Sequence, residues 1–350
     1  MKKDVKVIKK NVAIIAGGYS SEFDVSLRSA ENLYAYINKE RYNVYRVILK
    51  KDAWEVVIGE AEEIGKAGKT GRTPISPASP IYPIDKNNFS FLQGNDIVQI
   101  DFAYITIHGT PGEDGRLQGY FDMLGIPYST CGVLTSALTF NKYACNQFLK
   151  SCGVAVADSI LLQKTQPVFP EKIVEKLGLP LFVKPNEGGS SFGVTKVKEM
   201  AQIQEALEKA FDESSEAIIE RFIPGIELTC GCYRTGDKFI VFPITEVIPA
   251  NEFFDYGAKY NGEVQEITPA RIPAELTGLI QRETEKIYNL IGAKGIIRVD
   301  YMVTPDEIPV MLEVNTTPGM TATSFIPQQV RVAGLNMKDI MTEIIENNEK

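Results

Sequence analysis

The sequence predicts an α/β protein of two or three domains whose first domain is built on a parallel sheet. Its 350 residues, at roughly 150 residues per domain, provide enough chain for that many hydrophobic cores. Up to residue 130, apolar runs typical of buried strands alternate with helical patterns, as in strands joined by crossover helices. Hydrophobic residues make up 44% and charged residues 23% of the chain, so an ordinary globular protein is expected.

The first domain begins with a strand, a helix and a second strand. The apolar run Val12–Ala16 ends at Gly17-Gly18, and Ser20–Asn38 then carries apolar residues at helical spacing. Lys66–Pro83 is rich in Gly, Pro, Ser and Thr, so we expect an exposed excursion there. The elements expected in this domain are strands at Val12–Ala16, Val44–Leu49 and Phe102–Ile107 and a helix at Ser20–Asn38.

The rest of the chain predicts two further α+β units. Their expected elements are helices at Leu134–Leu149, Glu199–Phe211 and Ala274–Leu290 and strands at Leu181–Lys184, Glu227–Tyr233, Phe239–Ile244, Gly295–Val303 and Pro309–Glu313. Ligands of parallel sheets collect at the carboxyl ends of strands, which here are Gly17–Ser20 and His108–Gly115. We therefore expect these two segments to be candidate ligand-binding segments.

Charge and composition exclude several classes of partner. A formal net charge of −8 disfavours nucleic acid and anionic membrane surfaces. No run reaches the 18 or so apolar residues that span a bilayer, and Val12–Ala16 is too short for a secretion signal. The cysteines are odd in number: Cys131, Cys145, Cys152, Cys230 and Cys232. We therefore expect reduced thiols in a cytoplasmic protein.

Two segments carry features of phosphate-binding loops. Gly68-Lys69-Thr70 ends like a Walker loop, but Glu63 stands where the first glycine is needed, so that interpretation fails. In the second, Val183–Gly193, Lys184 closes a buried strand and is followed by glycines and serines that can donate to an anion. A polar loop joining two strands is the alternative interpretation of this segment.

The strongest chemical signal is a set of oxygen ligands on two neighbouring strands. Glu313 and Asn315 point to one face by the two-residue period, so they can converge with Asp300 on a magnesium-phosphate site. Carboxylates without partners are costly in a buried strand pair, which argues for function. The alternative interpretation is that these polar residues lie on solvated edge strands and bind no metal.

These motifs, in this order, resemble the ATP-grasp superfamily and, within it, the D-alanine:D-alanine ligases. The resemblance covers nearly the whole chain. The segments that carry it are Gly17–Ser26, His108–Gly119, Ser136–Lys142, Val183–Gly193, Glu220–Glu227, Tyr256–Tyr260 and Arg298–Thr321.

The resemblance implies a three-domain ATP-grasp architecture: an N-terminal substrate-binding domain over 1–130, a central domain over 131–220 and a C-terminal domain over 221–350. ATP would lie between the last two domains. Two Mg²⁺ ions, replaceable by Mn²⁺, would sit on Asp300, Glu313 and Asn315. The implied ATP-binding residues are Lys142, Lys184, Glu220, Arg221, Ile223, Glu227 and Lys259.

The implied reaction has two steps. The carboxylate of one D-alanine attacks the γ-phosphate of ATP, and the amine of a second D-alanine then attacks the acyl phosphate. Glu22 would hold the ammonium of the first substrate, with Ser190 and Tyr260 as its hydrogen-bonded partners. Arg298 and the Gly319 amide would stabilise the oxyanion. The remaining implied substrate contacts are Val25, Ser26, His108, Ser324 and Phe325.

Four positions depart from the pattern of the family. Arg221 stands where many members have lysine, and Phe325 stands where leucine is usual. Phe192 replaces a smaller aliphatic residue, and Gly188 stands where some members have glutamate. We expect the adenine contact at 221 to run through the backbone, and the packing around Phe192, Gly188 and Phe325 to differ from that of other members.

The second substrate and the catalytic status have alternatives. Lys259-Tyr260 resembles the dipeptide-forming ligases; D-lactate-using relatives carry a histidine in this loop, whereas His108 is the one histidine here. D-serine stays open as second substrate. A non-catalytic ATP-binding relative is disfavoured because Glu22, Lys142 and Lys184 persist beside the metal ligands. The resemblance further implies a cytoplasmic homodimer that supplies D-alanyl-D-alanine for peptidoglycan.

Overall fold

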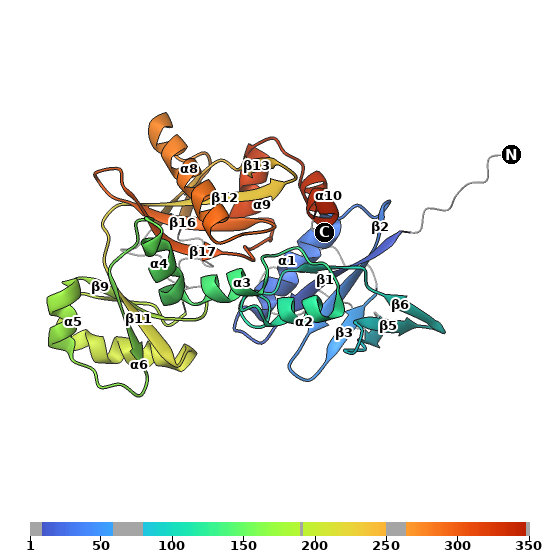
Figure 1. Cartoon of the computed structure of the whole chain (residues 1–350), viewed down its shortest axis with the longest axis horizontal. Coiled ribbons are helices and arrows are strands. Elements are labelled where there is room, and N and C mark those ends of the chain that lie inside the picture. Colours follow the sequence, from blue (N-terminus) through green and yellow to red (C-terminus); the bar gives the residue numbers. More distant parts are fainter. Residues whose placement is uncertain (1–8, 59–79, 190–191, 250–263, 348–350) are drawn as a thin grey trace.

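The computed structural model describes residues 9–58, 80–189, 192–249 and 264–347. Within these ranges the chain forms three sheets one after another, each packed against helices, and a small hairpin. In Figure 1 the first sheet (blue), the second (green to yellow) and the third (yellow to red) surround a central region from three sides. The α/β prediction is therefore confirmed.

The first sheet has the strand order β4-β3-β2-β1-β7. Its elements are β1 (Lys10–Gly17), α1 (Phe23–Tyr36), β2 (Tyr42–Leu49), β3 (Trp54–Val57), β4 (Ile81–Pro83), β7 (Phe102–Ile105) and α2 (Arg116–Leu124), with the hairpin β5 (Ser90–Gln93) and β6 (Asp96–Gln99) beside it. β1 is parallel to β2 and β7, as predicted, whereas β3 and β4 add an antiparallel edge.

The central strand explains the apolar run at the start of the chain. Val12 and Ile14 of β1 belong to one hydrophobic core, while Ala13 and Ile15 belong to the core on the opposite face. A strand buried on both faces has no polar side to show, so its sequence is continuously apolar.

One prediction for this domain needs correction. The expected excursion Lys66–Pro83 lies largely outside the described residues, but its end, Ile81–Pro83, is strand β4. It hydrogen-bonds to β3, because Tyr82 pairs with Val56. A short edge strand of this kind carries too little apolar alternation to be recognised in a Pro-rich stretch.

The second sheet is antiparallel, with the order β10-β9-β11-β8. Its elements are β8 (Ser159–Gln163), α5 (Pro170–Leu177), β9 (Leu181–Pro185), β10 (Thr195–Val197), a 3₁₀ turn (Met200–Gln202), α6 (Ile203–Glu213) and β11 (Glu216–Arg221). Helices α5 and α6 pack on this sheet in a core of their own, which includes Ile173, Val183, Leu207 and Ile219.

The third sheet has the order β15-β14-β12-β16-β17, and β13 also pairs with β12. Its elements are β12 (Ile226–Thr235), β13 (Lys238–Val241), β14 (Thr245–Pro249), β15 (Val264–Ile267), α8 (Ala274–Leu290), β16 (Ile297–Val303), β17 (Pro309–Asn315), α9 (Phe325–Val332) and α10 (Met337–Asn347). The strand expected at Phe239–Ile244 ends three residues earlier, and α8 has the predicted bounds.

The two faces of β12 have different roles. Leu228 and Cys230 point into the core formed with α8, whereas Thr229 and Gly231 face the side covered by α9. This follows from the two-residue period of a strand. The α8 face is purely structural, so the polar residues of the third sheet gather on the other face.

The single helix predicted at Leu134–Leu149 is wrong. The chain forms α3 (Val133–Phe140) and α4 (Lys142–Ser151), separated by Asn141 in an extended conformation (φ −86°, ψ 99°). The Asn141 side chain accepts a hydrogen bond from the Ala144 N–H at 2.9 Å, a standard N-cap. The apolar spacing of the two helices continues across the break, which concealed it.

Two of the cores join segments that are distant in sequence. One contains residues of α1 and β1 together with Ile326, Met337 and Met341 of α9 and α10, so the first and third sheets are packed together. Figure 1 shows α10 beside α1.

All five cysteines are free thiols. No helix among the described residues is long and apolar enough to cross a bilayer.

Candidate active site

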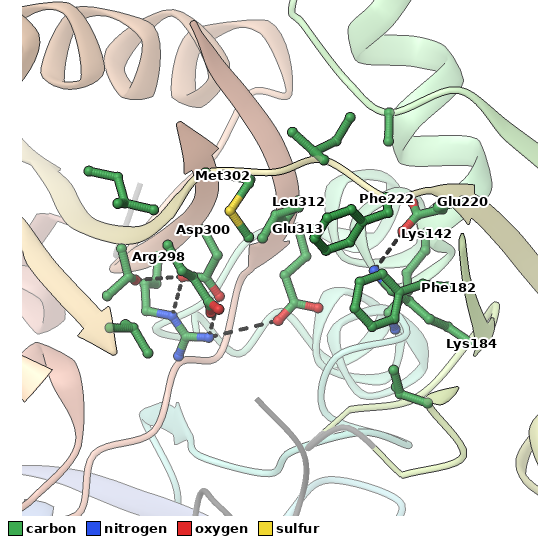
Figure 2. A pocket seen from close by; sticks show the side chains of 18 of the residues that line it. Lys142, Phe182, Lys184, Glu220, Phe222, Arg298, Asp300, Met302, Leu312 and Glu313 are labelled. Atoms are coloured by element: carbon green, nitrogen blue, oxygen red, sulfur yellow. Dashed lines mark hydrogen bonds and ion pairs between the residues drawn. The ribbon is translucent and has the colours of Figure 1, made fainter. Parts of the chain in front are cut away.

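A cavity of about 470 Å³ lies between the second and third sheets. Strands β9 and β11 line one wall, and β12, β14, β16 and β17 line the other. Figure 2 shows cationic and acidic side chains from both walls pointing into it. A deep cleft with convergent charges is the usual form of a small-molecule site.

Two lysines enter the cavity from the wall of the second sheet. Lys142 opens α4, directly after the break at Asn141, and its Nζ donates to the carbonyl of Gly188 at 2.5 Å. Lys184 lies near the end of β9 and pairs through Nζ with Oε2 of Glu220 at 2.5 Å. The two predicted phosphate-binding cations are thus brought together.

The surroundings shift the pKa values of the two lysines in opposite directions. Burial lowers the pKa of Lys142, and this outweighs the attraction of Glu313. Burial alone would also lower the pKa of Lys184, but the ion pair with Glu220 overcomes it and raises that pKa. Asn146 donates to the other oxygen of Glu220 at 2.9 Å and orients this carboxylate.

Part of the cavity lining forms an apolar slot. Phe182, Phe222, Met302 and Leu312 contribute to it (Figure 2). Such a slot suits a flat, apolar ring such as a nucleobase. The predicted adenine and ribose residues Glu220, Arg221, Ile223 and Glu227 all line the cavity.

The guanidinium of Arg221 does not point at the slot. Its Nη2 donates to the carbonyl of Lys176 at 3.2 Å and lies 3.8 Å from Asp158. The side chain is exposed, and its guanidinium is paired outside the slot. The expected backbone contact of residue 221 with adenine stays a prediction.

The three predicted metal ligands converge on the opposite wall. Asp300 pairs with Glu313 in the β16–β17 register, beside a bulge after Asp300. The Asn315 amide nitrogen lies 3.2 Å from Asp300 Oδ2 and 3.4 Å from Glu313 Oε1. Arg298 donates to both oxygens of Asp300 at 2.8 and 2.7 Å and lies 3.9 Å from Glu313 (Figure 2).

The donor chemistry of this set fits a hard divalent cation. Two carboxylates and one amide supply oxygens, which are the ligands that Mg²⁺ prefers. Which amide atom of Asn315 faces the carboxylates is an assignment, and a turned amide presents its oxygen instead. Among the described residues, no three His, Cys, Asp or Glu side chains are grouped so that they could hold a metal ion. The set proposed here has two carboxylates, and its third donor is an amide.

Electrostatics hold Arg298 in its cationic form. Burial alone would lower its pKa, but the paired carboxylate of Asp300 reverses this and raises it. Its guanidinium also lies over the Phe325 ring, 5.3 Å from the centroid. These contacts hold the arginine in the wall of the cleft.

The first domain contributes a corner with Glu22 and His108. Glu22 stands at the N-terminal end of α1 and is 8% exposed, and His108 follows β7 and is 6% exposed. A Cβ on Gly189 would lie only 2.7 Å from Glu22 Oε2, so the glycine loop after Lys184 reaches this carboxylate. Burial lowers the pKa of His108, against the attraction of Glu22.

Several predicted residues play no visible part in this corner. The hydroxyl of Ser26 donates to Thr106 O at 2.7 Å and accepts from Gly17 N at 2.9 Å, so it fastens α1 to the sheet. Val25 lies beside it, half-buried on α1. The predicted residues Ser190, Lys259 and Tyr260 lie outside the described residues.

A third group surrounds the start of α9. A Cβ on Gly319 would lie 2.9 Å from the Ser324 hydroxyl, so the two predicted residues are adjacent. The Ser324 hydroxyl also lies 2.7 Å from that of Thr321. Ser324 occupies the N-cap position of α9, whose free N–H groups favour an anion such as a carboxylate.

Sequence reasoning assigned no role to Glu113, which faces the same region. Its Oε2 accepts the Gly109 N–H at 2.7 Å. Burial, and then the charge of Glu22, raise the pKa of Glu113 to about 8. The sequence feature that could have indicated a role for Glu113 is its position in the segment that follows β7, because ligands gather at the ends of such strands. Thr229 and Asn146 could not be recognised from the sequence, because only their hydrogen bonds to Asp300 and Glu220 reveal their roles.

Comparison with known proteins identifies the family. The family model described as D-ala D-ala ligase N-terminus matches residues 11–131, and the model described as D-ala D-ala ligase C-terminus matches residues 148–346. A D-alanine–D-alanine ligase of Parabacteroides distasonis is 60% identical, over 98% of each chain. One from Phocaeicola vulgatus is 58% identical, over 97% of this chain and 99% of the relative.

Solved structures agree with this family. The VanG D-Ala:D-Ser ligase from Enterococcus faecalis matches with a TM-score of 0.83 and 33% identity, over 97% of this chain and 100% of that one. A D-alanine–D-alanine ligase from Bacillus anthracis complexed with ATP matches with a TM-score of 0.73 and 30% identity, over 97% of each chain. The chain belongs to the D-alanine–D-alanine ligase family, with the ATP-grasp fold.

Proposed function

We propose that this protein uses ATP to join two D-alanine molecules into D-alanyl-D-alanine. The observation that carries the proposal is the meeting of three groups around one cleft: the lysines of the second sheet, the Arg298–Asp300–Glu313 cluster of the third, and Glu22 of the first. Relatives named D-alanine–D-alanine ligase at 58–60% identity, over nearly the whole chain, support this substrate.

The apolar slot would take the adenine, and Lys142 and Lys184 would take the phosphates. Lys184 is paired with Glu220, and a phosphate of ATP would be a further partner of this lysine. Phosphoryl transfer depends mainly on positioning and on compensation of negative charge, which two partly buried lysines can supply. A divalent cation on Asp300, Glu313 and Asn315 would neutralise the transferring phosphate when bound.

The first D-alanine would bind with its ammonium at Glu22. Its carboxylate attacks the γ-phosphorus, ADP leaves, and an acyl phosphate forms. The amine of the second D-alanine then attacks the acyl carbon, and phosphate leaves. Arg298 and the Gly319 N–H would stabilise the oxyanion, while Ser324 and the start of α9 would hold the second carboxylate.

We extend the proposal to organisation and setting. The domain division 1–130, 131–220 and 221–350 is retained as a proposal, although Leu149 and Val154 already share a core with the third sheet. We further propose a magnesium-dependent cytoplasmic homodimer that serves peptidoglycan synthesis. Ser190, Lys259 and Tyr260 retain their proposed contacts to substrate and ATP.

The test is phosphate release in the presence of Mg²⁺ and ATP, with the product identified by mass. D-alanine alone should give the dipeptide, and L-alanine should give no product. Mixed product from D-alanine with D-serine or D-lactate, at rates above that of D-alanyl-D-alanine, would reassign the second substrate. ATP binding without turnover by any of these would indicate a non-catalytic relative.

A further inference from the structure

The strand β12 has a gap in its hydrogen bonding beside the cleft. Up to Thr229 it pairs with β14, where Thr229 lies opposite Thr245. From Cys232 onward it pairs with β13. Between these two ladders, the Thr229 carbonyl and the Gly231 N–H point toward a side where none of the described strands supplies the matching groups. Buried backbone groups of this kind need a partner.

The side-chain amide of Gln329 fills this gap. Gln329 lies on α9 and is fully buried. Its Oε1 accepts the Gly231 N–H at 3.2 Å, and its Nε2 donates to the Thr229 carbonyl at 3.1 Å. The second proton of Nε2 goes to the Thr245 hydroxyl, also at 3.1 Å. The amide thus takes the place of a missing peptide group in the sheet.

The three contacts fix the orientation of this amide. A turned amide would set N–H against the Gly231 N–H and oxygen against the Thr229 carbonyl, so only one orientation satisfies both. The packing is equally specific, since a Cβ on Gly231 would lie 2.4 Å from Ile326 and 2.6 Å from Gln329 Oε1. Helix α9 therefore rests on β12 in one position.

This contact joins two parts of the proposed site. One end of α9 carries Ser324, proposed above to hold the second carboxylate. The strand under Gln329 carries Thr229, whose hydroxyl donates to Asp300 Oδ1 at 2.5 Å. We propose that Gln329 is a positioning residue that sets the α9 carboxylate site in register with the Arg298–Asp300 cluster. The proposal rests on the dipeptide-forming function proposed above.

The informative variant is Gln329→Met, which keeps the length of the side chain and removes its hydrogen bonds. We expect the KM for the second D-alanine to rise by about 10- to 100-fold, because small displacements of a positioning group are costly. The KM for the first D-alanine and the Kd for ATP should stay within about twofold of the parent values. Gln204→Leu, an exposed glutamine on α6, is the control.

A merely structural role gives a different result. In that case Gln329→Met lowers the unfolding temperature and the amount of active enzyme but leaves all KM values unchanged, and the proposal is overturned. Thr245→Val removes one of the three contacts and should give a smaller rise in the same KM; it decides the question if Gln329→Met does not fold. Absence of dipeptide synthesis by the parent protein would instead refute the proposed function itself.

Discussion

At the scale of single residues, the two oxygens of Asp300 are held by Thr229, Arg298 and Asn315. Thr229 is 1% exposed and lies on the neighbouring strand, beside the proposed metal ligand Asp300. Hydrogen-bond partners of a metal ligand orient it and tune its charge. Their loss commonly lowers metal affinity or activity by about 10- to 100-fold.

We expect Thr229→Val to reduce activity by about 10- to 100-fold at low Mg²⁺, because a hydroxyl that orients a ligand is removed. Added Mg²⁺ should recover part of the loss. A magnesium titration of initial rates measures this. Thr229→Ser keeps the hydroxyl and should behave like the parent; equal magnesium dependence of all three proteins would refute a role of Thr229 in metal binding.

The partly buried carboxyl of Glu113 predicts a pH dependence of stability. Its pKa in the folded protein is raised to about 8, above that of an exposed glutamate. A group raised in this way contributes its full stability below the unfolded pKa, and that contribution is lost as the pH rises through the folded pKa. The window therefore runs from about pH 4.5 to about pH 8.

We expect Glu113→Gln to flatten the fall in unfolding free energy over this window, because the variant cannot ionise. Urea unfolding of the ligand-free protein at several pH values measures it. Glu205→Gln, an exposed glutamate on α6, is the control. An unchanged slope for Glu113→Gln would show that Glu113 is ionised at neutral pH.

At the scale of elements, the break between α3 and α4 directs Lys142 into the cleft. In a continuous helix, the direction of the residue 142 side chain would be set by the turn of α3. Because Asn141 is extended, a new helix begins at Lys142, whose backbone N–H is bound to Asn186. The Lys142 N–H donates to Asn186 O at 3.0 Å, and Asn186 Oδ1 accepts from Tyr143 N at 2.9 Å. The end of β9 is thereby fastened to the start of α4.

We expect Asn141→Ala to lower the free energy of unfolding by about 1 kcal/mol, the usual cost of losing an N-cap. It should also weaken ATP binding, because Lys142 is the next residue. Denaturant unfolding and nucleotide titration measure the two effects. Asn141→Ser can still cap the helix and should retain most of the stability and most of the ATP affinity. If Asn141→Ala lost stability without any change in nucleotide affinity, the break would not position Lys142.

At the scale of the whole molecule, the first and third sheets form one body. Their common core includes Leu33 of α1 and Met341 of α10, and Asn32 donates to Met320 O at 2.6 Å across the junction. The second sheet has a separate core. The cavity thus lies between one large body and one smaller unit, each with its own packing.

We expect Met341→Ala to destabilise the protein by about 2–5 kcal/mol, as for other large-to-small core changes. Because the core is shared, hydrogen-exchange protection should fall in β1 as well as in α10. Leu207→Ala, in the core of the second sheet, should instead reduce protection mainly in β9 and β11. If Met341→Ala left β1 fully protected, the first and third sheets would be independent units.

The sequence by itself determined the elements with strong periodicity and the site residues carried by motifs. The continuous apolar run of β1, the bounds of α8 and the convergence of Asp300, Glu313 and Asn315 all follow from local spacing. Only the tertiary structure decided the break at Asn141, the raised pKa of Glu113 and the amide of Gln329 in the gap of β12. The physical reason is that each of these also involves a residue distant in the chain, namely Asn186, Glu22 and Thr229 in turn, and no local pattern records such a contact.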